Sequence, residues 1–188
     1  MQKTILLIII SCFTVKNVNS QITKGNWMVG GNASFLFTNS NTDNVGSKTT
    51  NINIAPNIGY FFIDKFAGGV RLSFNREHTK FAPGNNFQIF TNYSIGPFFR
   101  YYFLPKDRQY NILSEASYQF GSDKVETSNS TTSNGRSNNF TFSVGPVIYF
   151  NTSVGIEFLL NYKSAGNYVN SRSNSFGVGI GFQIHLEK

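Results

Sequence analysis

The chain has 188 residues, a formal net charge of +7 and a single cysteine, Cys12. One cysteine excludes a disulfide framework and a cysteine-ligated metal site within the chain. Its positive charges are scattered and form no basic stripe, which argues against nucleic-acid binding. Phe, Tyr, Gly, Asn and Ser are abundant whereas Ala, Leu and Glu are scarce, so the composition favours strands and turns over helices.

Residues 1–20 have the pattern of a secretory signal peptide. Lys3 supplies a positive start, an apolar run covers residues 4–15, and the segment ends on a small residue. We expect this segment to be removed, which leaves 21–188 as one domain. Lipoprotein processing at Cys12 is an alternative, because the residues before it loosely resemble a lipobox.

Eight segments of the remaining chain alternate apolar and polar residues with the period of two that is typical of strands. In chain order their apolar faces run from Trp27 to Phe37, Ile52 to Phe62, Phe66 to Phe74, Phe87 to Phe103, Tyr110 to Phe120, Phe140 to Phe150, Val154 to Tyr162 and Phe176 to Leu186. The opposite faces carry mainly Gly, Ser and Asn. The pattern predicts an all-β fold, an eight-stranded antiparallel up-and-down transmembrane β-barrel.

The connections between these segments alternate in length. Short turns are predicted at 63–65, 104–108 and 151–152, and long polar loops at 39–49, 77–86, 121–138 and 165–174. This asymmetry is typical of membrane barrels, whose periplasmic turns are short and whose extracellular loops are long. We expect both termini on the periplasmic side and the Ser/Thr/Asn-rich 121–138 loop to be mobile.

A proline, a cluster of aromatic residues and a short turn occur together three times. Because proline donates nothing to a strand ladder, Pro56, Pro97 and Pro146 predict a repeated bulge or kink. The aromatic clusters predict an interfacial girdle at the periplasmic rim. Its expected members are Tyr60, Phe62, Tyr101, Phe103 and Phe150.

Alternation alone does not distinguish a membrane barrel from a soluble, lipocalin-like barrel, because both have one apolar and one polar face. The apolar face here is bulky and aromatic over about ten residues per strand, as a lipid-facing band requires. The other face is rich in glycine and poor in Lys and Glu, which suits the narrow interior of an eight-stranded barrel. The membrane barrel is therefore favoured.

The segment from Pro56 to Gly69 (PNIGYFFIDKFAGG) resembles a hairpin motif of small outer-membrane β-barrel proteins, particularly those of Bacteroidetes. The segment GFQIHL, at 181–186, is similar to the C-terminal signal read by the barrel-assembly machinery, although the chain ends on Glu187 and Lys188 and lacks a terminal aromatic. The resemblance to OmpA/OmpX-like barrels implies a cell outer membrane location and a monomer. The implied partners are outer-membrane lipid, lipopolysaccharide and, during insertion, the assembly machinery.

Four charged residues fall on the polar, inward faces: Arg71, Arg100, Glu115 and Glu157. Charges in a narrow lumen must be paired, since an unpaired buried charge costs several kcal/mol. We expect Arg100 to pair with Glu115 on the neighbouring strand and Arg71 to reach Glu157 across the lumen. Such a network is either a structural plug or a gate whose pairs exchange to open a small pore.

No catalytic, cofactor or metal site is predicted. His78 and His185 fall at opposite ends of their strands, and neither lies in the His-x-Ser pattern of lipid A deacylases. We therefore expect a non-enzymatic protein with a structural or surface-interaction role through its loops. A narrow porin-like channel for small solutes or ions is the alternative, and an envelope lipid-modifying enzyme is less favoured.

Overall fold

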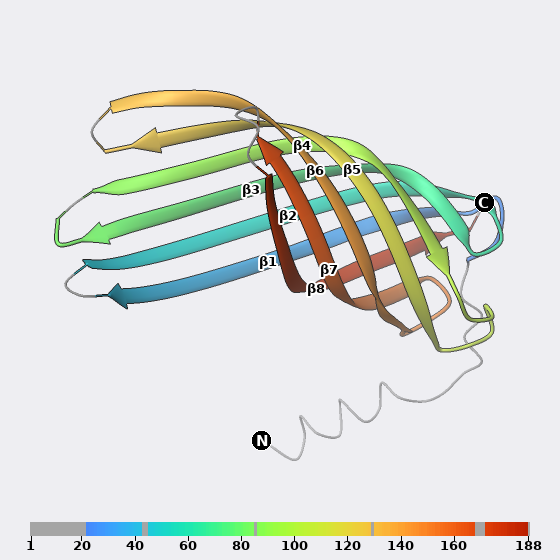
Figure 1. The fold of residues 1–188 in the computed structure, drawn as a ribbon. Helices are drawn as coiled ribbons and strands as arrows, with labels where there is room; N and C mark the ends of the chain where they lie inside the picture. Colours follow the sequence, from blue (N-terminus) through green and yellow to red (C-terminus); the bar gives the residue numbers. More distant parts are fainter. Residues whose placement is uncertain (1–21, 43–44, 85, 129, 168–171, 188) are drawn as a thin grey trace, which may run out of the picture.

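The computed structural model describes residues 22–42, 45–84, 86–128, 130–167 and 172–187, and it contains eight strands (Figure 1). Each strand pairs antiparallel with the next, and the last pairs with the first to close an up-and-down barrel, as predicted. The predicted signal peptide and Cys12 lie outside the described residues. The strands are β1 (Trp27–Thr42), β2 (Val45–Ile63), β3 (Phe66–Ala82), β4 (Phe87–Tyr102), β5 (Tyr110–Thr127), β6 (Ser130–Tyr149), β7 (Val154–Asn167) and β8 (Arg172–Leu186).

The outer surface of the barrel is apolar. Alternate residues of every strand expose large hydrophobic side chains, as the sequence pattern predicted. Among the described residues, no helix is long and apolar enough to cross a membrane. Of the residues predicted to form a girdle, Phe62, Tyr101, Phe103 and Phe150 are exposed, and Tyr60 packs between Trp27 and Phe62 with ring centroids 5.3 and 5.5 Å away.

The short connections lie where they were expected, whereas most of the predicted loop residues are in strands. Two residues, Asp64 and Lys65, join β2 to β3, and Lys65 takes a positive φ of 68° in this turn. The 121–138 segment is a paired hairpin, with Gly121 opposite Ser137 and Val125 opposite Ser133. The prediction of a loop there is wrong, because the polar residues form a ladder that satisfies their backbone groups, whereas the predicted mobility of the segment stays a prediction.

The other predicted long loops are shortened in the same way. Within 39–49, Asn39 lies opposite Lys48 in the β1–β2 ladder. Within 77–86, β3 continues to Ala82, and within 165–174 β7 continues to Asn167 and β8 begins at Arg172. These polar strand ends carry the ladders beyond the apolar segments of the sequence.

The prolines do not mark bulges. Val70 lies opposite Pro97, and the register between β4 and β5 is the same before and after this proline, although the ladder skips Gly96 and Pro97. The strands approach closely here instead: a Cβ atom on Gly96 would lie 1.9 Å from the carbonyl oxygen of Tyr118. A Cβ atom on Gly145, the residue before Pro146, would likewise lie 1.9 Å from the carbonyl oxygen of Phe158. Glycine is required because no side chain fits.

Closure of the barrel is confined to one half. Strands β1 and β8 pair only from Trp27 opposite Leu186 to Ala33 opposite Ile180. The start of β1 and the end of β8 therefore both lie at the short-turn end of the barrel. Beyond this, β1 follows β2 and β8 follows β7, and the two edges separate (Figure 1). We call the short-turn half the closed half, the other the split half, and the gap between β1 and β8 the seam.

Candidate functional site in the barrel lumen

The lumen of the closed half is filled by side chains in layers. At the short-turn end lies an apolar plug, next to it lies a network of charged residues, and above that a polar cavity extends towards the split half. The three layers arise from the same alternation that directs the apolar residues outward, since every second residue of each strand points inward.

Arg100 on β4 is the centre of the charged network. Its Nη2 and Nε atoms donate to Glu115 Oε2 at 2.8 and 3.0 Å, and its Nη1 donates to Glu157 Oε1. Arg71 on β3 binds the same Glu115 carboxylate with both Nη atoms, at 2.9 Å for Nη2 and Oε2. Each of the four side chains is at least 94 % buried. Two arginines and two glutamates thus form one electrically neutral, continuous cluster.

The structure confirms one predicted pair and corrects the other. Arg100 pairs with Glu115, which is its partner in the β4–β5 register. The predicted Arg71–Glu157 pair is wrong: Arg71 binds Glu115, and Arg100 is the residue that crosses the lumen to Glu157 on β7. The physical reason lies on the intervening strand, where Arg71 is opposite Gly96. Because glycine has no side chain there, Arg71 can extend past β4 to β5.

Hydrogen bonds extend the network around the barrel. Gln183 on β8 accepts from Arg100 Nη1 at 3.3 Å and donates to Asn57 on β2 at 3.2 Å. The hydroxyl of Tyr102 accepts from Arg100 Nη1 at 3.2 Å. The network therefore joins β2, β3, β4, β5, β7 and β8. Sequence reasoning missed Gln183 and Asn57, because neutral amides on an inward face give no signal of their own.

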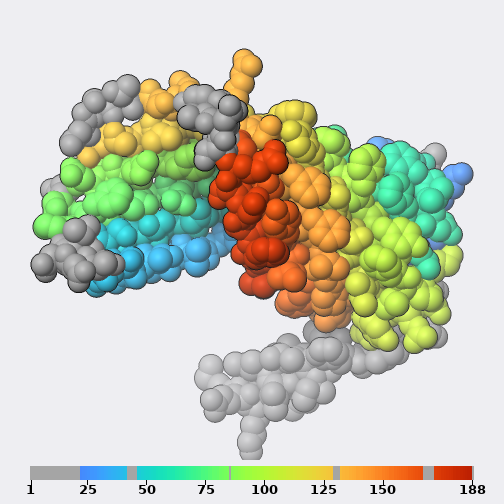
Figure 2. Space-filling model, viewed as in Figure 1, coloured from blue at the N-terminus to red at the C-terminus, as the bar shows by residue number. Residues whose placement is uncertain are grey.

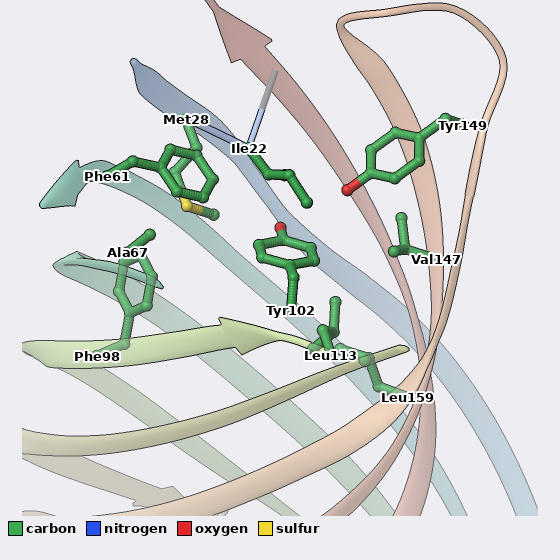
Figure 3. Close-up of a cluster of buried hydrophobic side chains, with 10 residues drawn as sticks. All are labelled: Ile22, Met28, Phe61, Ala67, Phe98, Tyr102, Leu113, Val147, Tyr149 and Leu159. Atoms are coloured by element: carbon green, nitrogen blue, oxygen red, sulfur yellow. The ribbon is translucent and has the colours of Figure 1, made fainter. Parts of the chain in front are cut away.

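The plug consists of large apolar and aromatic side chains with almost no exposure (Figure 3). Phe61 and Tyr102 lie with their ring centroids 6.0 Å apart, and His185 packs edge-on against Phe61 at 5.5 Å. Sequence reasoning placed His185 inward but missed the plug. The available signal was the adjacent aromatic pairs, Phe61-Phe62, Phe98-Phe99 and Tyr101-Tyr102, since two neighbouring aromatics on a strand put one ring on each face.

The segment before β1 seals the short-turn end. Ile22 is fully buried in the plug, and its carbonyl accepts a hydrogen bond from the Lys65 amide at 2.9 Å. The Lys24 amide donates to the Asp64 carboxylate at 2.8 Å, and the Gly25 amide donates to the Phe61 carbonyl at 2.9 Å. These contacts fix the segment to the β2–β3 turn and cover the plug from below.

Above the charged network lies a cavity of about 170 Å³, which we call the vestibule. Its lining is mostly Ser, Asn, Thr and Gln, many of them already hydrogen-bonded to each other, such as Gln119 to Ser73 at 2.8 Å and Ser143 to Asn161 at 2.6 Å. Arg71 and Lys163 are the charged members of the lining. The vestibule is a polar recess that ends on the network and does not continue through it.

The two histidines lie far apart in the fold. His185 is in the plug, whereas His78 packs against Phe87 near the opposite end of β3. Among the described residues, no group of three His, Cys, Asp or Glu side chains could hold a metal ion. What the lumen offers chemically is therefore hydrogen bonding and charge, held in fixed positions.

Comparisons with known proteins give a fold and no family. No protein-family model matches the chain, and no curated protein does. Among solved structures, the chain is similar to the crystal structure of Neisserial surface protein A, with a TM-score of 0.55 and 17 % sequence identity. The match covers 88 % of this chain and 98 % of that one. At this identity the likeness concerns the arrangement of the strands.

Proposed function

We propose that this chain is an integral outer-membrane β-barrel protein, non-catalytic, with a lumen closed to solutes and a structural or surface-interaction role. The observation that carries the proposal is that the barrel is polar inside and apolar outside, the reverse of a soluble protein. Its interior holds buried charged side chains, among them the four of the network, whereas large apolar side chains such as Phe120 and Leu160 are 60 % and 54 % exposed on the outside. A soluble barrel would expose this apolar surface to water at high cost, while a bilayer removes the cost.

The outer membrane is the location that these features fit best. Closed barrels are the β-structures that span membranes, because pairing around the ring satisfies their backbone groups, and the closed half has such a ring. The resemblance of the Pro56–Gly69 hairpin and the 181–186 segment to outer-membrane barrels supports this location, as does a structural neighbour named as a surface protein. On this proposal both ends of the barrel face the periplasm, lipid and lipopolysaccharide surround it, and the barrel-assembly machinery inserts the monomer.

The filled lumen favours a structural or surface role over the porin-like alternative. The neutral network occupies the centre of the closed half, and beneath it Phe61, Tyr102 and Ile22 fill the short-turn end. A conducting path would require both layers to move. The β1–β2, β3–β4 and β5–β6 hairpins all extend into the split half (Figure 1), and on this proposal their polar ends meet molecules outside the cell.

Membrane insertion is tested by expressing the full chain in a Gram-negative host and fractionating the envelope. We expect the protein in the outer-membrane fraction, with an electrophoretic mobility that changes on boiling, because folded barrels resist unfolding in dodecyl sulfate. Recovery as a soluble periplasmic protein without heat-modifiable mobility would contradict the proposal and favour the lipocalin-like alternative.

The closed lumen is tested by planar-bilayer conductance of the wild type and of Arg100→Ala. We expect both to be silent, because the plug remains when the network is cut. Arg136→Ala, on the exposed face of β6, is the matched control for loss of an arginine. Conductance by the wild type would support the porin-like function, and conductance by Arg100→Ala alone would show that the network is a gate.

A further inference from the structure

The seam leaves strand edges without partners at the level of the apolar surface. Among the described residues, 34–42 of β1 and 172–179 of β8 have no partner across it. The flanking outward side chains are among the most exposed in the described part of the protein: Phe35 is 69 %, Phe176 78 % and Val178 85 % exposed. Unpaired backbone groups are costly in hydrocarbon and are tolerated where they line a polar cavity. The split edge therefore requires a polar recess beside it.

The vestibule opens to the outside through the seam. An apolar groove of about 610 Å³ runs along the seam between Phe35 on β1 and Leu160 on β7, and it shares Ala33, Ser34, Val178 and Gly179 with the vestibule lining. Leu36, which the alternation places on the inward face, is 61 % exposed. Figure 2 shows the surface hollowed beside the edge of β8, with the cyan and green strands visible beyond it. Groove and vestibule form one continuous recess.

The β8 side of this recess is bare because of its glycines. A Cβ atom on Gly177 would meet nothing within 4 Å, and one on Gly179 would meet only the Asn161 amide nitrogen, at 3.0 Å. At these two positions the inner wall has no side chain to fill the space that the missing β1 partner leaves. The recess is thus open on its β8 side at the seam.

The chemistry of the recess changes from apolar to polar along its length. The groove is lined mainly by Phe, Leu, Val and Ile side chains. Lys163 is a cation in the vestibule lining that forms no ion pair among the described residues. The buried Asp123 carboxylate, which attracts it, accepts its hydrogen bonds from Asn92 and Ser137 instead. The buried Nε–H of Arg71, another lining residue, has no hydrogen-bond acceptor in the part of the chain that is described. A ligand with an anionic, acceptor-rich head and an apolar tail complements this arrangement.

We propose that the seam is a lateral portal that binds one long-chain fatty acid from the membrane, with its carboxylate in the vestibule near Lys163 and its alkyl chain along the apolar groove. A cavity of about 170 Å³ suits a carboxylate and a few waters of about 30 Å³ each. The network and the plug beneath stop the ligand from passing through the barrel. The proposal rests on membrane insertion as proposed above, and adds a ligand to a role that was otherwise structural.

The portal is tested by closing it with a disulfide. If the β1–β8 register continued past Ala33 and Ile180, Phe35 would lie opposite Val178. A Phe35→Cys/Val178→Cys protein, in a Cys12→Ser background, forms a disulfide that closes the seam on oxidation, and reduction opens the seam again. Val29→Cys/Ile184→Cys, at a pair already in register, is the matched control. The readout is [¹⁴C]palmitate retained by the purified, heat-modifiable protein in maltoside detergent, with stoichiometry from native mass spectrometry.

We expect one palmitate per wild-type barrel. Oxidation of the seam pair lowers retention at least tenfold and reduction restores it, whereas the control pair binds alike in both states. Gly179→Phe, which fills the recess without requiring a disulfide, gives the same loss. Lys163→Gln weakens binding about tenfold, the value of one charge-assisted hydrogen bond, and Lys48→Gln, on the outer face of β2, leaves it unchanged.

Retention that survives both the closed seam and Gly179→Phe places the palmitate elsewhere and overturns the portal. Equal retention of uncharged hexadecanol overturns the role of Lys163 and the anionic head. A disulfide between two barrels carrying Val178→Cys alone, with no palmitate bound, shows that a second copy covers the seam, which also overturns the proposal. Protein that never becomes heat-modifiable contradicts membrane insertion itself, whereas an inserted barrel that retains no palmitate contradicts the portal alone.

Discussion

The closed half and the split half are built from the same eight strands, yet their interiors differ in almost every respect. In the closed half, all strands are paired in a ring around buried side chains, most of whose polar atoms are hydrogen-bonded. In the split half, β1 and β8 separate and the interior becomes a polar recess. The difference teaches that the alternating pattern alone does not close the wall, because Phe35 and Phe37 continue the outward face of β1 beyond its last partner on β8.

Hydrogen exchange provides the largest expected contrast between the halves. In the Trp27–Ala33 and Ile180–Leu186 segments, β1 and β8 are paired. Amides that form hydrogen bonds between these two segments should exchange only on global opening, which costs about 5–15 kcal/mol in folded domains. Seam-facing amides in 34–42 and 172–179 should exchange with little protection. Exchange by mass spectrometry on the inserted barrel measures this. Equal protection in both parts would show that the seam is closed in the bilayer.

Removal of Arg100 should destabilise the closed half strongly. Arg100→Ala leaves the carboxylate of Glu157 buried without its arginine, and breaking a buried ion pair in this way costs about 3–5 kcal/mol. The free energy of unfolding in urea, measured in lipid vesicles, checks the loss. Arg136→Ala, at an exposed position, should leave stability unchanged.

A charge-balanced version of the network sharpens this test. If the loss in Arg100→Ala comes from uncompensated charge, then Arg100→Leu combined with Glu157→Gln should be more stable than Arg100→Ala, because Arg71 and Glu115 remain as a neutral pair. A double variant that is less stable than Arg100→Ala would show that packing and hydrogen-bond geometry, and not charge, dominate the closed half.

Two alanine substitutions should show a smaller difference. Gly145→Ala places a methyl group against the Phe158 carbonyl oxygen, and overpacking of this kind costs about 1–3 kcal/mol. Gly177→Ala, on the free edge of β8, meets no atom within 4 Å and should be close to neutral. Parallel urea titrations of the two proteins provide the comparison. A neutral Gly145→Ala would mean that β6 and β7 can separate without loss.

The fold could be predicted because period-two alternation is a local property that each strand displays by itself. Phe176 to Leu186 alternates without interruption and forms an outward face. The lengths of the strands were harder to predict from the sequence. Polar residues in 121–138 look like a loop, but pairing between β5 and β6 satisfies their backbone, so tertiary context overrides composition.

The residues of the charged network could be predicted from the sequence, whereas most of their contacts could not. The inward faces identified Arg71, Arg100, Glu115 and Glu157, and the hairpin register was enough to pair Arg100 with Glu115. Partners across the lumen depend on the stagger of the strands and on which neighbours lack side chains, and Gly96 was the residue that redirected Arg71. The seam could not be predicted for a related reason, since its two edges have the same alternating pattern as paired strands.

The separations of Arg100 from its partners along the chain have a consequence for biogenesis. Glu115 lies 15 residues away, within the same hairpin, whereas Glu157 and Gln183 lie 57 and 83 residues away. A nascent barrel that has assembled only β1 to β6 contains Arg71, Arg100 and Glu115, so the network itself holds two arginines and one glutamate. Arrival of β7 supplies Glu157 and balances the network, and arrival of β8 supplies the Gln183 amide. The network of Arg100 is therefore complete only when the last two strands have joined the barrel.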